Sequence, residues 1–136
     1  MRLPPRPRLL IVDDSIVVRR VLALTVRQLP ELAHAELDEA GNGAIALKKL
    51  GQAPYDLVLS DVRMPLVDGF EMLRVARGEM GLTIPIVLIS TLGREEDVQR
   101  GMEAGATAYI MKPLSPHHIK VALREILDAP EPPRPA

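Results

Sequence analysis

The sequence predicts an α/β fold in which one parallel β-sheet carries helices on both faces. Three observations support this prediction: apolar runs of strand length alternate five times with segments of helical periodicity, the third and fourth runs are apolar nearly throughout, and 136 residues are enough for one domain. Strands that alternate with helices form parallel pairs through right-handed crossovers. The expected architecture is therefore a doubly wound sheet of five strands.

The first strand and helix follow a lead that is rich in proline and arginine. Residues 9–12 form a short apolar run that ends in Asp13 and Asp14, and Ser15 can cap the next helix. That helix is expected to end before Pro30. The positions of its core-facing stripe recur at helical spacing: Val18, Val21, Leu22, Thr25, Val26 and Leu29.

The next two strands differ in polarity. Residues 36–40 are too polar for the centre of a sheet, so this strand is expected at an edge. A helix that begins at Asn42-Gly43 follows it. Residues 55–61 are an apolar run that stops at Asp61, and a third helix that ends near Gly78 or Gly81 comes after it.

The last two strands complete the alternation. Residues 86–90 are the most β-branched run of the chain and predict a central strand. A helix over residues 94–104 has few apolar side chains and is expected to pack loosely. The fifth strand covers residues 107–112, and Ser115 can cap the last helix. The polar edge strand and the apolar third strand fit the order 2-1-3-4-5 of flavodoxin-like, three-layer α/β/α folds.

Composition excludes several classes of function. With 18 acidic and 17 basic side chains the formal net charge is −1, so no overall field attracts nucleic acid or an anionic membrane. The chain has no cysteine and hence neither disulfides nor thiolate metal sites. No apolar run is long enough to span a bilayer, and the N-terminus lacks the apolar stretch of a signal peptide. We therefore expect a cytoplasmic protein.

Proline content divides the chain into three parts. Residues 1–7 are expected to be a disordered lead, residues 8–128 the folded domain, and residues 129–136 a Pro-rich tail or a truncated linker. Whether the chain is a single-domain protein or a part of a longer one stays open.

Polar side chains follow four of the predicted strands. They are Asp13 and Asp14 after the first, Asp61 at the end of the third, Ser90 at the end of the fourth and Lys112 at the end of the fifth. Because the carboxyl ends of parallel strands meet at one edge, these side chains converge on one crevice. Each has an ordinary explanation alone, as a turn, a helix N-terminus or a surface charge. A coincidence at four strand ends is less plausible than a site.

Phosphoryl transfer is the chemistry that suits such a crevice. Three clustered carboxylates repel one another and favour a bound cation, and an all-oxygen set favours Mg²⁺ or Mn²⁺ over zinc. Lys112 offers a positive charge to phosphoryl oxygens, and Ser90 offers a hydroxyl. Asp61 would then be the nucleophile that forms an aspartyl phosphate.

Four motifs occur in order along the chain. They are residues 9–15 (LLIVDDS), residues 56–61 (DLVLSD) with Met64-Pro65 and Asp68-Gly69 after them, residues 85–90 (PIVLIS), and residues 105–113 (GATAYIMKP). In order and spacing they closely resemble the receiver domains of two-component response regulators, over roughly residues 8–127. Ser15 and the pair Arg19-Arg20 are most similar to receivers of the chemotaxis type.

The resemblance implies a role for each residue at this sheet edge. Asp61 would be the phosphoacceptor and Lys112 its phosphate contact, while Asp13 and Asp14 would bind the metal together with the main-chain carbonyl of Arg63. The phosphoryl donor would be a sensor histidine kinase or a histidine phosphotransfer protein. Such a domain catalyses only its own phosphotransfer and slow autodephosphorylation.

The resemblance also implies how the signal leaves the site. Ser90 would be the switch hydroxyl and Tyr109 the switch aromatic, and the Lys112-Pro113 bond would be cis. The face formed by the fourth helix, the fifth strand and the fifth helix would then control a downstream protein or an output domain.

A partner surface is expected on the first helix. Ile16, Ala23 and Leu24 lie away from the stripe of core positions, and exposed apolar side chains beside a crevice indicate where a histidine-bearing helix packs. Scattered surface hydrophobes are the alternative explanation.

Three other classes of protein share part of this pattern. A flavodoxin-like cofactor protein would need glycines and hydroxyls in the first loop, where two carboxylates stand. A haloacid-dehalogenase-type phosphatase would have a second Asp at the place of Arg63. A receiver-like interaction module that is never phosphorylated is the main alternative, and the complete acceptor set disfavours it.

Overall fold

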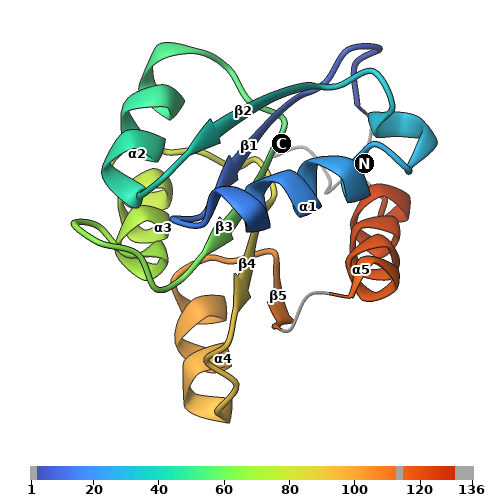
Figure 1. Cartoon of the computed structure of the whole chain (residues 1–136). Helices are drawn as coiled ribbons and strands as arrows, with labels where there is room; N and C mark the ends of the chain where they lie inside the picture. The colour runs from blue at the N-terminus through green and yellow to red at the C-terminus, as the bar shows by residue number, and fades with distance from the viewer. Residues whose placement is uncertain (1–2, 113–114, 131–136) are drawn as a thin grey trace.

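The computed structural model describes residues 3–112 and 115–130. Five parallel strands form one sheet in the order β2-β1-β3-β4-β5, as the sequence predicted (Figure 1). The strands are β1 (Arg8–Val12), β2 (Glu36–Ala40), β3 (Leu57–Asp61), β4 (Ile86–Ser90) and β5 (Ala108–Met111). The helices are α1 (Ile16–Val26), α2 (Gly43–Gln52), α3 (Gly69–Gly78), α4 (Glu95–Glu103) and α5 (Pro116–Asp128), with a 3₁₀ turn η1 (Pro30–Leu32).

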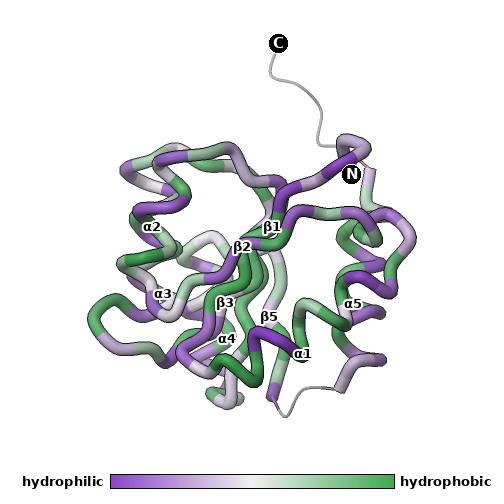
Figure 2. Tube along the Cα trace, turned by 45° about the horizontal axis from the view of Figure 1, so that its top comes forward, coloured by the Kyte–Doolittle hydropathy of each residue, from purple (hydrophilic) through white to green (hydrophobic). Residues whose placement is uncertain are grey.

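The hydrophobic core has two layers, one on each face of the sheet. On one face α1 and α5 cover alternate strand residues such as Leu9, Leu59 and Val87. On the other face α2 and α3 cover the intervening residues, including Leu10 and Val58. β3 and β4 are buried along their whole length, which explains their continuous apolar sequence. Figure 2 shows the contrast between these apolar strands and the hydrophilic edge strand β2.

Polar side chains cap four of the helices. The side chains of the N-cap residues accept a hydrogen bond from a main-chain N–H of the first turn, and these residues are Ser15, Asn42, Asp68 and Ser115. Such caps satisfy donors that have no partner inside the helix. The α4 helix has no side-chain cap at Arg94. Its acidic first turn, however, suits the positive end of the helix dipole.

Some apolar residues of α1 and α5 differ in burial from the sequence prediction. Ala23 was expected on the exposed face of α1, but it is half-buried and packs against the core. The reason is that α1 packs beside α5 as well as on the sheet, which widens its buried arc. Val17 is exposed instead, and Leu123 of α5, which the sequence analysis did not assign, is fully buried.

The chain ends make contacts of their own. Leu3 packs against the core layer of α1 and α5, and the carbonyl of Pro7 accepts a hydrogen bond from the N–H of Glu36.

Pro113, of the expected cis bond, and residues 131–136 of the expected tail lie outside the described residues. Within the described ranges, no helix has both the length and the apolar character needed to cross a membrane.

Candidate phosphoacceptor site

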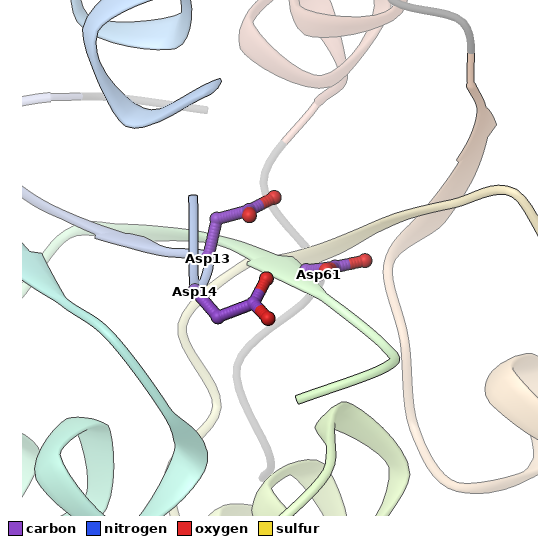
Figure 3. A group of neighbouring side chains, drawn as sticks. All are labelled: Asp13, Asp14 and Asp61. Carbon is purple, nitrogen blue, oxygen red and sulfur yellow. The ribbon is translucent and has the colours of Figure 1, made fainter. Parts of the chain in front are cut away.

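Three carboxylates meet at the carboxyl edge of the sheet. β1 and β3 are neighbours with Val12 opposite Ser60, so the residues that follow lie side by side. One oxygen from each of Asp13, Asp14 and Asp61 lies within 4.8 Å of the others (Figure 3). The parallel sheet therefore brings together two acids from one loop and a third from a strand end 47 residues later.

The loops around these acids are tightly built. The Asp13 carboxylate accepts a hydrogen bond from the Ser15 N–H at 2.9 Å, and Asp61 Oδ1 accepts one from the Val62 N–H at 2.8 Å. The Gly69 N–H donates to the Val62 carbonyl at 2.7 Å, and a Cβ at Gly69 would overlap the Asp61 carbonyl oxygen. This close approach explains why the Asp68-Gly69 motif requires glycine.

The ammonium group of Lys112 faces the acids. Lys112 Nζ lies 3.0 Å from Asp13 Oδ2 and 3.4 Å from Asp61 Oδ1. Burial lowers the pKa of Lys112, but its contacts with these two carboxylates outweigh burial and the net shift is upward. Burial, followed by the charge of Asp13, raises the pKa of the Asp61 carboxyl, which Lys112 only partly offsets. The site therefore has more negative charge than the protein neutralises.

Two hydroxyl groups connect the neighbouring strands. Ser90 is fully buried at the end of β4, and its Oγ accepts a hydrogen bond from the Leu92 N–H at 3.0 Å. Tyr109 of β5 is half-buried, and its hydroxyl donates to the Leu92 carbonyl at 2.6 Å. Burial raises the pKa of Tyr109. The Leu92 peptide is therefore held between the two expected switch residues.

An open cleft of about 460 Å³ adjoins the acids. Its lining includes Asp14, Arg63, Leu92 and Arg100, and the Arg100 guanidinium lies 4.4 Å from the centre of the Phe70 ring. Sequence reasoning missed Arg100, because no local pattern shows that α4 approaches α3 here. The expected metal contact of the Arg63 carbonyl stays a prediction.

Sequence reasoning also missed the role of Arg19. One of its nitrogens donates to the Asp13 carbonyl at 2.6 Å, and another pairs with Glu39 Oε1 at 2.8 Å. The acid loop is thereby tied to the end of β2. The Arg19-Arg20 pair was noticed in the sequence only as part of a resemblance, and the pairing partner on β2 gave no local signal.

Apolar side chains are exposed on α1 beside the site. Ile16, Val17 and Leu24 are 56%, 68% and 69% exposed, whereas Ala23 is half-buried and packs against the core. Leu66, in the loop after β3, is exposed and has a positive φ of 68°. Of the three residues expected to form the docking surface, Ile16 and Leu24 are exposed and Ala23 is half-buried. Val17 is a further exposed apolar residue of α1.

Comparison with known proteins identifies the family. Residues 9–124 match the family model of the response regulator receiver domain. The chain is 40% identical over 118 residues to the two-component response regulator ORR41 of Oryza sativa subsp. japonica, with 85% of this chain and 91% of that protein covered. It is 37% identical over 120 residues to the transcriptional regulatory protein ResD of Bacillus subtilis (strain 168), with 88% of this chain and 48% of ResD covered. The chain thus spans about half the length of ResD.

Solved structures agree in fold. The chemotaxis response regulator CheY4 of Vibrio cholerae has a TM-score of 0.79 and 32% identity, covering 89% of this chain and 98% of that one. The CheX-CheY-BeF₃-Mg complex of Borrelia burgdorferi gives a TM-score of 0.82 and 27% identity, covering 93% and 92%. The protein belongs to the receiver domains of two-component response regulators, and its fold is the flavodoxin-like, CheY-like fold.

Proposed function

We propose that this receiver accepts a phosphoryl group on Asp61, in the presence of a divalent cation, and that the modification changes its α4-β5-α5 face. The observation that carries the proposal is the excess of negative charge at the carboxyl edge of the sheet. Three carboxylate oxygens lie within 4.8 Å of one another, and one ammonium group faces them. Repulsion among these carboxylates destabilises the fold. A bound cation would offset the repulsion and allow a phosphoryl group to approach.

The donor set fits Mg²⁺ or Mn²⁺. All three side chains offer oxygen, and Asp14 is exposed, so a cation that keeps several water molecules can approach. Asp13, Asp14 and Asp61 would hold it, with the main-chain carbonyl of Arg63. When bound, the cation supplies positive charge beside the nucleophile and the incoming phosphoryl oxygens.

Asp61 carries the covalent step. The hydrogen bond from the Val62 N–H and the ion pair with Lys112 both fall on Oδ1, so we assign the attack on phosphorus to Oδ2. A P–O bond forms as the P–N bond of a phosphohistidine breaks, and the electron pair of that bond stays with the imidazole nitrogen. The Lys112 ammonium, 3.4 Å from Asp61 Oδ1, is close enough to bind a phosphoryl oxygen. The chain itself catalyses this transfer and a slow hydrolysis only.

The donor is a sensor histidine kinase or a histidine phosphotransfer protein that docks on α1. Ile16 and Val17 are exposed apolar side chains that directly follow the acid loop, and Leu24 is exposed further along α1, where a helix carrying the phosphohistidine would pack. Leu24→Glu should therefore slow transfer from a protein donor but not from acetyl phosphate, which needs no docking. Equal loss with both donors would argue against a docking role.

The signal leaves through Ser90 and Tyr109. A phosphoryl group on Asp61 gives the Ser90 hydroxyl a charge-assisted partner, and Ser90 already contacts the Leu92 peptide that Tyr109 holds. The target is a downstream protein or an output domain of a longer chain. We further propose that residues 8–128 form the receiver unit and that it works in the cytoplasm.

Intact mass spectrometry tests the proposal. Incubation with acetyl phosphate and Mg²⁺ should add the mass of one phosphoryl group, and excess chelator or Asp61→Asn should abolish the gain. Asp68→Asn is the matched control, because Asp68 lines the same cleft but only caps α3, and asparagine caps equally well. A gain that survives Asp61→Asn would contradict the proposal. No gain in the parent protein would favour a non-phosphorylated interaction module.

A further inference from the structure

The α4 helix meets the sheet through a glycine. Of its nine residues only Asp97 and Gly101 are buried. A Cβ at Gly101 would lie 3.0 Å from Leu88 Cδ1 and 3.1 Å from Tyr109 Cδ2, closer than ordinary van der Waals contact. The Tyr109 ring therefore lies directly against the α4 backbone, in space that any other residue at position 101 would fill.

The two neighbours of Gly101 differ in freedom. Leu88 is fully buried in β4, where close packing leaves it no alternative position. Tyr109 is half-buried, so its ring can leave by rotating about χ1 toward solvent. The Tyr109 hydroxyl donates to the Leu92 carbonyl, and Leu92 in turn contacts Ser90. Continuous contacts thus run from the end of β4 through Tyr109 to Gly101.

We propose that Gly101 is a positioning residue for Tyr109. The missing side chain at this place in α4 lets the ring occupy its inward position and make the hydrogen bond to Leu92. A methyl group there drives the ring outward, because Leu88 cannot yield. The consequence for signalling rests on the proposed function: a receiver without the inward ring position takes up phosphate at Asp61 but does not pass the change to α4.

Tyrosine-labelled NMR spectra test the inward position directly. The chain has two tyrosines, and Tyr55, which is 6% exposed and far from α4 in the sequence, serves as an internal reference. In Gly101→Ala the Tyr109 ring signals should move toward free-tyrosine values and broaden with a soluble paramagnetic agent, while Tyr55 stays unchanged. Gly78→Ala is the matched control, because Gly78 is also helical and a Cβ there meets nothing within 4 Å. Unchanged Tyr109 signals in Gly101→Ala would overturn the proposal.

A double-mutant cycle of unfolding stability shows whether Tyr109 or Leu88 clashes with a side chain at position 101. Alanine favours helix over glycine, so Gly101→Ala should stabilise α4 unless a clash opposes it. We expect Gly101→Ala to lower the unfolding midpoint in the parent and not to lower it in a Tyr109→Ala background. A loss that persists in Tyr109→Ala would assign the clash to Leu88 and overturn the proposal. If Gly101→Ala alone does not fold, rescue by Tyr109→Ala supports the proposal, and failure of rescue contradicts it.

Both measurements are made without phosphoryl donor, so they are independent of the proposed function. With acetyl phosphate and Mg²⁺, Gly101→Ala should gain phosphate as the parent does, while its Tyr109 signals no longer respond. Failure of the parent to gain phosphate would overturn the proposed function alone. A parent-like Tyr109 response in phosphorylated Gly101→Ala would overturn the positioning role alone.

Discussion

The two ends of the sheet hold charged clusters that differ in balance. At the carboxyl end, three carboxylates face Lys112, and burial together with Asp13 raises the pKa of Asp61. Toward the amino end, Asp38 in the middle of β2 accepts hydrogen bonds from Arg8, the first residue of β1, at 2.9 Å and from Tyr55, just before β3, at 2.6 Å. Burial raises the pKa of Asp38, but these hydrogen bonds outweigh burial and lower it overall.

The difference separates a cluster that stabilises the fold from the cluster that we propose to bind a cation. Where Arg8 and Tyr55 satisfy the carboxylate of Asp38, the charge stabilises the fold, and burial with the neighbouring Asp38 raises the pKa of Tyr55 to about 12. Where the protein leaves carboxylates in excess, the fold bears a cost that an external cation can remove.

The largest expected effect is on Mg²⁺ affinity, which a substitution at the carboxyl end should weaken and a substitution at the amino end should not. Asp14→Ala removes one carboxylate of the trio and should weaken Mg²⁺ binding at least about tenfold, since loss of even an indirect partner of a metal ligand has effects of that size. Asp38→Asn should leave Mg²⁺ affinity unchanged. Titration calorimetry measures both. Equal weakening in the two variants would remove the distinction between the clusters.

Stability should fall when the amino-end cluster is broken. Asp38→Asn replaces charge-assisted hydrogen bonds from Arg8 and Tyr55 with neutral ones and should lower the free energy of unfolding by about 1–2 kcal/mol. Urea unfolding monitored by circular dichroism measures this change. A neutral effect would show that Arg8 and Tyr55 are as well satisfied by solvent.

Stability should rise when the carboxyl-end excess is reduced. Asp61→Asn removes a buried carboxylate that Asp13 repels, and in chelator it should raise the free energy of unfolding, because burial and Asp13 both disfavour the charged form. The same unfolding experiment applies. A destabilised Asp61→Asn would mean that the contact with Lys112 outweighs burial and repulsion.

Lowering the pH should reduce both the destabilisation by Asp61 and the stabilisation by Asp38, each in its own range of pH. The folded-state pKa of Asp61 is raised, so its destabilisation is complete above that pKa and vanishes as the pH falls through it to the ordinary carboxyl range. The folded-state pKa of Asp38 is lowered, so its stabilisation is present above the ordinary carboxyl range and is lost only as the pH falls through the lowered value. Unfolding of the parent and both variants at successive pH values in chelator checks the order. If the difference in unfolding free energy between Asp38→Asn and the parent vanished at a higher pH than the difference for Asp61→Asn, the assigned directions of the two pKa shifts would be wrong.

The sequence sufficed for those parts of the site that the sheet itself brings together. The alternation of strand and helix and the polarity of residues 36–40 fit the strand order of flavodoxin-like folds, and this predicted order is confirmed. Because parallel strands end at one edge, the acids could be expected near Lys112, whose contact with Asp13 joins residues 99 positions apart. Their roles as metal ligands and phosphoacceptor stay predictions.

Contacts that depend on packing between helices could not be foreseen. The burial of Ala23 depends on how α5 lies beside α1, and the Arg100 contact with Phe70 depends on how α4 approaches α3. The position of the Tyr109 ring depends on a missing side chain at Gly101. Periodicity specifies which face of a helix is apolar, but not how far a neighbouring element extends over it.

The most direct test of this account is a carboxyl-carbon NMR titration of Asp61 and Asp38, with and without Mg²⁺. Without the cation, Asp61 should titrate above the ordinary aspartate range and Asp38 below it. Mg²⁺ should lower the pKa of Asp61 and leave that of Asp38 unchanged. If Asp61 titrates in the ordinary range, or if Mg²⁺ shifts both groups alike, the carboxyl end holds no excess charge for a cation and the account is wrong.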